Sequence, residues 1–173
     1  MTAVTTWSRQ DLADHRDALL DVYAAAMGVD RRVARARRSI VTGHLDRRGL
    51  AAVAAHDGDL LVGVAYGYVG ERGQWWHDQV DAAMTRETAQ RWLHGAFEVC
   101  ELHVLPSHQG TGTGRALLDA LLSGRSGTAV LTTPDAETRA RAFYRAGGWV
   151  DLVRDLRFPG DPRSFAVLGL ALG

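Results

Sequence analysis

The chain contains no lysine, so every basic residue apart from histidine is an arginine. Arginine does not act as a neutral base or form a Schiff base, and lysine-based catalysis is therefore excluded. Cys100 is the only cysteine, which excludes an internal disulfide and a cysteine-based metal cluster. The 20 acidic residues balance the 20 basic ones, so the net charge gives no general affinity for nucleic acid or membrane surfaces.

Long hydrophobic runs are also absent. No apolar run approaches the roughly 20 residues of a membrane-spanning helix, and the first seven residues lack the apolar core of a signal peptide. We expect a soluble, cytoplasmic protein. The length of 173 residues predicts a single domain over residues 1–173 that can bury a sizeable core.

The segment 97–122 carries the clearest pattern in the chain. Phe97 to Leu105 is mostly apolar and has the length of a central strand. Pro106 ends this strand because proline has no N–H for the ladder. A glycine-rich turn then leads into a helix with leucines at helical spacing. Such a turn lets the backbone approach a ligand, and the free N–H groups of the first helical turn point at it. We therefore expect this segment to bind a phosphate or pyrophosphate group.

The glycine spacing distinguishes between phosphate-binding motifs. A Walker A loop requires a lysine, which this chain lacks. A dinucleotide fingerprint has Gly-x-Gly-x-x-Gly near the start of a βαβ unit, whereas these glycines fall late in the chain with a different spacing. The segment instead resembles motif A of the GNAT superfamily of acyl-CoA-dependent N-acetyltransferases, Leu-x-Val-x-Pro-x-x-(Arg/Gln)-(Gly/Arg)-x-Gly-x-Gly/Ala. Seven residues match it in register: Leu102, Val104, Pro106, Gln109, Gly110, Gly112 and Gly114.

A second segment extends the resemblance toward the C-terminus. Residues 128–133 are expected to form a buried strand, and Pro134 and Asp135 are expected to open a helix that ends at Gly147-Gly148. Ala140, Phe143 and Tyr144 are expected on its inner face. This segment resembles the second GNAT motif, Asn-x-x-Ala-x-x-x-Tyr-x-x-x-Gly-Phe. Matches fall at Ala140, Tyr144 and Gly148, while Trp149 replaces the usual aromatic and Glu137 stands where Asn is common.

The resemblance implies an α/β GNAT fold, with a mixed, mostly antiparallel central sheet of about seven strands flanked by helices. The other expected elements are a strand at Ala3–Trp7, a helix from a Ser8 cap to Met27, a helical stretch from Asp30 to about Arg47, hairpin strands at 50–55 and 60–69, a helix from about Gln79 to Leu93, and strands at 150–157 and 164–170.

Two segments have two interpretations each. The arginine-rich stretch 30–47 is either a solvated helix face or a wall of the acceptor site. The adjacent Trp75 and Trp76, expected in a loop, either form a hydrophobic plug under the following helix or line the acceptor pocket. In the second case their flat aromatic surface would favour an apolar or cationic substrate.

The resemblance also implies the reaction. An acetyl group passes from acetyl-CoA to a primary amine by direct attack in a ternary complex, without an acyl-enzyme and without a metal. Tyr144 is the candidate general acid, because a phenol with a pKa near 10 stays protonated at neutral pH and can donate to a departing thiolate. A backbone N–H near Val104 is the candidate donor to the oxyanion.

Two carboxylates on the central strand are candidates for the general base. Glu98 lies where several GNAT branches place the base, eleven residues before the glutamine of motif A, and Glu101 lies closer to the cofactor. Strand alternation places Glu98 with Cys100 and Leu102, and Glu101 with His103. Only one of these two sets can face the acceptor unless a bulge intervenes.

For acetyl-CoA, the resemblance implies two binding segments. The strand edge at Leu102, His103 and Val104 pairs with the pantetheine amides. The pyrophosphate is held by the turn and the first helical residues: Gln109, Gly110, Thr111, Gly112, Thr113, Gly114 and Arg115. Arg115 would act as a charged donor to the phosphate oxygens.

The acceptor is a small-molecule or peptide amine. A small amine, an antibiotic, an amino acid and a protein N-terminus all fit the pattern. No nucleic-acid or membrane partner is expected, and a homodimer stays open because GNAT proteins are often dimers. Two other function classes remain: a non-catalytic acyl-CoA-binding or sensing module, which would lack a working Tyr144 or base, and a nucleotide-binding regulator, in which ATP or NAD would compete with CoA.

Overall fold

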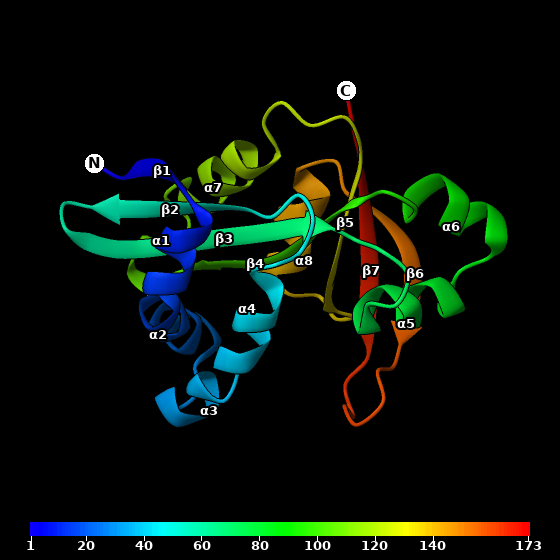
Figure 1. The fold of residues 1–173 in the computed structure, drawn as a ribbon, viewed down its shortest axis with the longest axis horizontal. Coiled ribbons are helices and arrows are strands. Elements are labelled where there is room, and N and C mark those ends of the chain that lie inside the picture. Colours follow the sequence, from blue (N-terminus) through cyan, green and yellow to red (C-terminus); the bar gives the residue numbers. More distant parts are fainter. The chain divides into compact units, whose positions relative to one another are not determined.

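The computed structural model describes all residues from 1 to 173. Its seven strands form one sheet in the order β1-β2-β3-β4-β5-β7-β6 (Figure 1). The pairs β1–β2, β2–β3, β5–β7 and β6–β7 are antiparallel, whereas β4 and β5 are parallel. The predicted mixed, mostly antiparallel sheet with flanking helices is therefore confirmed. None of the helices is both long and apolar enough to cross a bilayer.

The chain divides into two compact units, residues 1–68 with 99–124 and residues 69–98 with 125–173. Because β4 (Phe97–Val104) begins in the second unit and ends in the first, both units hold part of the segment 97–122. The expectation of a single domain over residues 1–173 stays a prediction.

The first unit contains the N-terminal strands and five of the helices. β1 pairs with β2 from Ala3–His56 to Trp7–Ala52, and β2 and β3 form a hairpin. Its elements are β1 (Ala3–Trp7), α1 (Arg9–Asp14), α2 (Arg16–Met27), α3 (Arg31–Arg35), α4 (Arg38–His44), β2 (Ala51–Asp57), β3 (Leu60–Val69, whose last residue belongs to the second unit), the 3₁₀ turn η1 (Pro106–His108) and α7 (Thr113–Leu122).

The first predicted helix forms as two helices. Ser8 caps α1 as expected, since its Oγ accepts from the Asp11 N–H at 3.1 Å and the Asp11 carboxylate accepts from the Ser8 N–H at 2.8 Å. The helix does not run on to Met27, because His15 leaves helical geometry at φ −98° and ψ 14°. Its Nδ1 lies 2.8 Å from the Asp11 carbonyl oxygen, and its ring stacks on Trp7. A side chain bonded to the preceding turn competes with the helical ladder, so the chain bends there.

The predicted helix 30–47 also forms as two shorter helices. The Asp30 carboxylate caps α3 by accepting from the Arg32 N–H at 2.7 Å. The chain turns at Arg37, which has φ −80° and ψ −2° and precedes α4. Arg37 therefore lies in the turn between the two helices, and its side chain is not part of a regular face of either helix.

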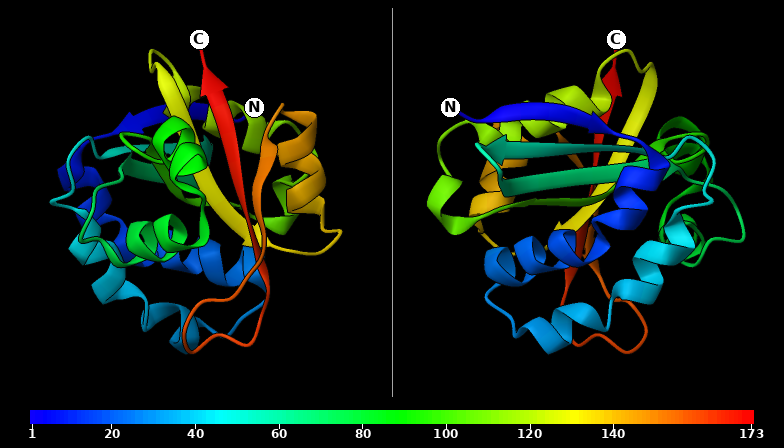
Figure 2. Two further views of the ribbon diagram at one scale, coloured as in Figure 1. Left: turned by 90° about the vertical axis from the view of Figure 1, so that its right-hand side faces the viewer. Right: turned by 60° about the vertical axis from the view of Figure 1, so that its left-hand side comes forward.

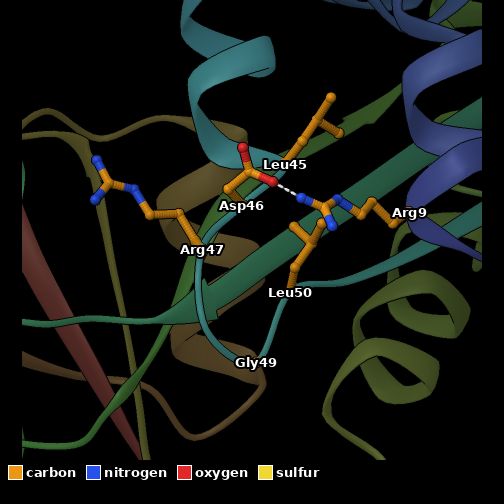
Figure 3. A pocket seen from close by; sticks show the side chains of 6 residues that line it. All are labelled: Arg9, Leu45, Asp46, Arg47, Gly49 and Leu50. Carbon is orange, nitrogen blue, oxygen red and sulfur yellow. Dashed lines mark ion pairs between the residues drawn. The ribbon is translucent and has the colours of Figure 1, made fainter.

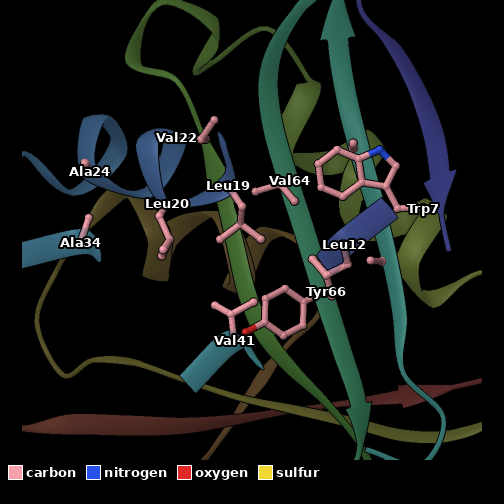
Figure 4. Close-up of a cluster of buried hydrophobic side chains, with 12 residues drawn as sticks. Trp7, Leu12, Leu19, Leu20, Val22, Ala24, Ala34, Val41, Val64 and Tyr66 are labelled. Atoms are coloured by element: carbon pink, nitrogen blue, oxygen red, sulfur yellow. The ribbon is translucent and has the colours of Figure 1, made fainter. Parts of the chain in front are cut away.

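Helices pack on both faces of the strands in the first unit. On one face, Tyr66 and Val64 of β3 join Leu12 and Leu19 in an apolar cluster (Figure 4). On the other face, α7 lies close against β3, because a Cβ atom added at Gly63 would come within 2.9 Å of the Leu117 side chain. Gly63 thus permits the close approach of α7, and this packing fixes the start of α7 relative to the end of β4.

The second unit contains the C-terminal strands and three helices (Figure 2). β5 pairs with β7 from Gly127–Leu172 to Pro134–Phe165, and β4 pairs with β5 at Phe97 and Glu98. α5 and α6 contribute side chains to an apolar cluster with β5 and β7. The elements are α5 (Trp75–Ala83), α6 (Arg86–Trp92), β5 (Gly127–Pro134), α8 (Arg139–Ala146), β6 (Val150–Leu156) and β7 (Phe165–Leu172).

The tryptophan pair does not lie in a loop as expected. Trp75 and Trp76 form the first turn of α5, and the predicted helix 79–93 is divided at Thr85, which caps α6 by accepting from the Thr88 N–H. Trp76 packs against the apolar cluster, and its Nε1–H donates to the Thr132 hydroxyl at 3.3 Å. Trp75 is 57% exposed. The two neighbours therefore differ in exposure: Trp76 packs into the cluster, whereas Trp75 covers Phe158 of the same cluster, with ring centroids 5.4 Å apart, and stays largely exposed.

The expected helix start at Pro134 and Asp135 is wrong. Pro134 is the last residue of β5, and α8 begins only at Arg139. The reason is that the Asp135 carboxylate accepts from the Asp155 backbone N–H at 2.7 Å and pairs with arginines, which holds it at the strand end. Ala140, expected on the inner face of the helix, is exposed, and Arg141 is buried instead.

Candidate active site

The glycine turn before α7 has the backbone geometry of an anion-binding site. Gly110 and Gly112 have φ of 79° and 91°, a region in which a side chain is strained. No side chain caps α7, and its first internal bond joins the Ala116 N–H to the Gly112 carbonyl. The N–H groups of the first turn therefore have no partner within the helix. A Cβ atom added at Gly112 would meet nothing within 4 Å, so the turn has room for a ligand.

Side chains of the turn brace its backbone. The Gln109 amide donates to the Val104 carbonyl at 3.0 Å and ties the turn to the end of β4. The Thr111 hydroxyl donates to the His108 carbonyl at 2.7 Å and lies 2.9 Å from the Thr113 hydroxyl. Gln109 was predicted to contact the pyrophosphate. In this structure its side-chain amide holds the glycine turn against the end of β4.

Arg115 lies on the first turn of α7, where it was predicted to bind phosphate. Its side chain is 43% exposed, and its guanidinium lies 4.0 Å from Asp119, one turn later on the helix. An exposed pair of this kind is worth at most about 1 kcal/mol. Asp119 therefore contributes little to the position of the Arg115 guanidinium.

Glu101 and His103 project from the same face of β4, as the alternation predicts, and are hydrogen-bonded. His103 Nε2 lies 2.5 Å from Glu101 Oε2. Arg37, from the turn between α3 and α4, donates to Glu101 Oε1 at 2.6 Å. Tyr23 of α2 completes the cluster: its ring meets the His103 ring edge-on at 5.0 Å, and the Arg37 guanidinium lies 4.7 Å from its centre. Both carboxylate oxygens of Glu101 are thus engaged.

This cluster holds Glu101 in its ionised form. Burial alone would raise the pKa of the Glu101 carboxyl, but the hydrogen bond from His103 and the positive charge of Arg37 together lower it below its usual value. Burial likewise disfavours the charged form of Arg37, yet the charge of Glu101 raises the pKa of that guanidinium. The two residues therefore form an ion pair with little tendency to exchange a proton.

A second histidine lies beside this cluster, between two tyrosines. His44 Nδ1 lies 3.0 Å from the Tyr66 hydroxyl, and His44 Nε2 lies 3.4 Å from the Tyr68 hydroxyl. Burial, reinforced by the charge of Arg47, lowers the pKa of His44. Burial, with the nearby charge of Glu101, raises the pKa of the Tyr66 hydroxyl well above its usual value. His44 is therefore a neutral imidazole with both ring nitrogens engaged.

The other predicted catalytic residues lie in the second unit. Glu98 is buried, with 5% of its surface exposed. A Cβ atom added at Gly70 would lie 4.0 Å from Glu98 Oε2 and 3.3 Å from the ring of His77. Glu98 thus shares an enclosed space with a buried histidine.

Tyr144 lies half-buried on α8, edge-on to Phe143 at 5.2 Å and to Trp149 at 5.6 Å. Arg141, one turn earlier on α8, is fully buried and pairs with Asp135 and Asp151. These contacts anchor the helix that carries Tyr144.

Three of these residues were not singled out in the sequence. Arg37 is one of several arginines in the stretch 30–47, and the spacing gives no sign that it reaches β4. Arg141 occupies a helix position with no special pattern, and His44 has no neighbouring motif. Of this cluster, only the placement of Glu101 and His103 on one face was predicted, from the alternation of side chains along the strand.

A surface pocket of about 260 Å³ lies between Arg9 and the segment 45–50 (Figure 3). An ion pair between Arg9 and Asp46 spans it, and both side chains are mostly exposed. The pocket contains none of the candidate residues. The glycine turn and the group of Glu101, His103, Arg37 and Tyr23, called here the β4 cluster, therefore remain the candidate site.

Comparison with known proteins identifies the family. A model of the acetyltransferase (GNAT) domain matches residues 47–151. A GCN5-like protein acetyltransferase of Mycobacterium tuberculosis is 37% identical over 184 aligned positions, covering 88% of this chain and 89% of the relative.

Solved structures share the fold. A protein from Desulfovibrio desulfuricans, described as a GNAT-family acetyltransferase, matches with a TM-score of 0.68 and 18% identity over 100% of both chains. A Salmonella typhimurium protein described as an acetyltransferase, solved with its cofactor acetyl-CoA, matches with a TM-score of 0.65 and 15% identity over 100% of this chain and 95% of that chain. The domain match and the mycobacterial relative establish that this chain belongs to the GNAT acetyltransferase family.

Proposed function

We propose that the protein transfers the acetyl group of acetyl-CoA to a primary amine by direct attack in a ternary complex. The observation that carries this proposal is the turn at Gly110 and Gly112, which opens onto the uncapped start of α7 with seven residues of motif A in register. Membership of the GNAT family supports the use of acetyl-CoA.

The residues around the turn fit the chemistry of CoA. The first-turn N–H groups, with the positive end of the α7 dipole behind them, suit a pyrophosphate. Gly110, Thr111, Gly112, Thr113 and Gly114 supply this backbone, braced by Gln109, and Arg115 adds a charged donor. The ladder between β4 and β5 ends at Glu98. Leu102, His103 and Val104 lie beyond that point, and their backbone would pair with the pantetheine amides.

When bound, acetyl-CoA supplies an acetyl thioester, whose carbonyl accepts the amine nitrogen and whose thiolate leaves. The protein's own residues then have three roles. A backbone N–H near Val104 would stabilise the oxyanion, and Tyr144 would donate its hydroxyl proton to the thiolate. Glu98 and Glu101 are the two candidate carboxylates for the base function. Glu101 is already ionised and doubly paired, which reduces its basicity.

The acceptor class has one source of support. The mycobacterial relative is named a protein acetyltransferase, so we propose that the acceptor is an amine of a protein or peptide, with small amines as the alternative. The cytoplasmic location, the lack of nucleic-acid and membrane partners, and the oligomeric state stay predictions.

The first test is a calorimetric titration of acetyl-CoA into the wild-type protein and a Gly112→Glu variant. The added carboxylate would occupy and repel the pyrophosphate site, so binding should be lost. Gly124→Glu is the matched control, because Gly124 follows the other end of α7 with φ of 71° and also has open space around it. It carries a similar backbone strain but should bind normally.

Binding by the wild type and the control, but not by Gly112→Glu, would support the proposal. A screen of peptide and small amines would follow, with Tyr144→Phe expected to slow turnover by about 10²-fold or more. If the wild-type protein binds neither acetyl-CoA nor longer acyl-CoA, the proposed function is wrong.

A further inference from the structure

The β4 cluster contains one group that is built to accept a proton, and it is not the Glu101 carboxylate. Glu101 is ionised, and its two oxygens accept from Arg37 and His103. An ionised carboxylate has no hydrogen to donate. The hydrogen in the 2.5 Å contact between Glu101 and His103 must therefore sit on His103 Nε2. In the neutral imidazole, Nδ1 then carries a lone pair.

The surroundings of His103 Nδ1 leave that lone pair available. Nδ1 makes no hydrogen bond within the chain. It is also not one of the fully buried polar atoms that lack a hydrogen-bond partner. The His103 side chain is 12% exposed to solvent. A carboxylate behind one ring nitrogen fixes the tautomer and stabilises the imidazolium that forms when the other nitrogen takes a proton.

His44 provides an internal contrast. It lies in the same unit, but both of its nitrogens contact tyrosine hydroxyls and its pKa is lowered by burial and by Arg47. It has no free nitrogen for a substrate, and no carboxylate is hydrogen-bonded to its ring. Of the two histidines, only His103 combines an open nitrogen with a carboxylate partner.

We propose that His103 Nδ1 takes the proton from the acceptor amine, and that Glu101 and Arg37 are positioning residues that act through it. This inference rests on the proposed acetyl transfer and assigns its base. The groups around His103 are Glu101 on β4, Arg37 from the α3–α4 turn and Tyr23 on α2. Arg37 keeps Glu101 ionised, and Tyr23 supports the ring from the side.

The proton balance of the reaction closes with this assignment. The acceptor enters as an ammonium, gives one proton to His103 Nδ1 and attacks with the lone pair so exposed. The C–N bond forms, the C–S bond breaks, and the thiolate takes the proton of the Tyr144 hydroxyl. The nitrogen loses its second proton, which restores that hydroxyl. His103 releases its proton to solvent, so each amide formed yields one free proton.

The first experiment observes the imidazole directly, without any ligand. Two-dimensional ¹⁵N NMR of protein labelled at histidine should show the neutral form of His103 with hydrogen on Nε2 and none on Nδ1. In Glu101→Gln, which can accept less strongly and can also donate, this preference should weaken. A His103 signal with hydrogen on Nδ1 in the wild type would overturn the inference, whatever the activity.

The second experiment measures turnover. In His103→Gln, the side-chain amide can still donate to Glu101 but has no basic nitrogen. We expect kcat/KM to fall by about 10²–10⁴-fold, with acetyl-CoA affinity within twofold of wild type. His94→Gln is the control, because His94 also contacts a carboxylate, Asp81 at 3.3 Å, but lies outside the proposed machinery. It should keep wild-type kinetics.

These outcomes separate the two proposals. A wild-type kcat/KM in His103→Gln would overturn the assignment of the base and leave acetyl transfer intact. Absence of turnover by the wild-type protein with every amine tested would overturn the proposed function, and the base assignment with it.

Discussion

Arg37 stands among several arginines that look equivalent in the sequence, yet its partner is on the central strand. Arg35 and Arg38 pair with Asp17 at the surface, at 3.3 and 3.4 Å. Arg37 reaches Glu101, whose side chain is only 9% exposed. Surface pairs contribute little, whereas removal of one partner from a buried pair leaves the other charge uncompensated.

We therefore expect Arg37→Met to destabilise the protein by about 2 kcal/mol. This is less than the 3–5 kcal/mol of a fully enclosed pair, because the Arg37 side chain keeps 35% of its surface exposed. The matched control Arg38→Met should change the free energy of unfolding by less than about 0.5 kcal/mol. Urea unfolding of the three proteins measures both values, and equal stability of the two variants would contradict the importance of the buried pair.

Glu101 also predicts a pH dependence of stability. Its pKa in the folded protein lies below the unfolded value of 4.5, so its contribution is fully present above pH 4.5 and is lost as the pH falls through the folded pKa. The charged and titratable groups around it are Arg37, His103, His44 and Tyr66. The difference in unfolding free energy between wild type and Glu101→Gln should therefore shrink below pH 4.5.

Urea unfolding at intervals from pH 7 to pH 3 measures this difference. A difference that stays constant to the lowest pH at which both proteins fold would show that the Glu101 carboxyl is not stabilised in its ionised form. That result would also remove the reason for treating it as the partner of the His103 imidazolium.

At the scale of elements, α8 is held by a charged side chain in an unusual position. Arg141 is fully buried between Asp135, at the end of β5, and Asp151 on β6. Arg154 also bonds to Asp135, at 2.8 Å. The helix is thus tied to two strands by a network of opposite charges. Such a network need not be more stable than an apolar core, but it specifies one arrangement and loses much when one member is removed.

Arg141→Met should destabilise the protein by about 3 kcal/mol, since it removes the fully buried guanidinium that Asp135 and Asp151 share. Arg154 also reaches both carboxylates, but its side chain is 55% exposed. Arg145→Met is the control on the same helix. Arg145 is 43% exposed and pairs with Glu137 at 3.2 Å, so its loss should cost less than about 1 kcal/mol. Chemical denaturation distinguishes the two, and a mild effect of Arg141→Met would mean that α8 is held mainly by apolar contacts.

The same elements show which features of the fold were predictable. The strands and the helix after motif A follow from hydrophobic pattern and glycine and proline positions, and they form as predicted. Helix ends depended on contacts that periodicity does not contain. His15 ends α1 through its bond to Asp11, and Asp135 stays at the end of β5 because Asp155 donates to it.

At the scale of the whole molecule, the candidate site was only partly predictable for the same reason. The glycine turn is local in sequence, so its spacing was sufficient to predict it. The β4 cluster joins residues 23, 37, 101 and 103, and only the last two are near each other in the chain. Long-range contacts of this kind require the packing of α2, α3 and α4 against β4, which no local pattern encodes.

The absence of lysine has a consequence for the whole chain as an acetyltransferase. No side chain within these 173 residues is a primary amine, which leaves the α-amino group at the start of the 173-residue chain. This amino group lies 3.2 Å from the Asp57 carboxylate, and the side chains of both residues are exposed. Arginine side chains stay protonated and do not react as amines. An enzyme that handles an activated acetyl group thus presents almost no amine of its own to compete with the acceptor.

We therefore expect prolonged incubation of the 173-residue protein with acetyl-CoA to modify no side-chain amine and to add at most one acetyl group, at the N-terminal amine. Intact-mass spectrometry followed by peptide mapping measures the number and the position. A variant with Arg38, an exposed residue outside the proposed site, replaced by lysine provides the comparison, and it should gain a second acetyl group under the same conditions if the added amine is accessible to the acetyl donor. Two or more acetyl groups on the wild-type chain would instead show that the protein modifies its own hydroxyl or thiol groups, which would contradict an exclusive preference for amines.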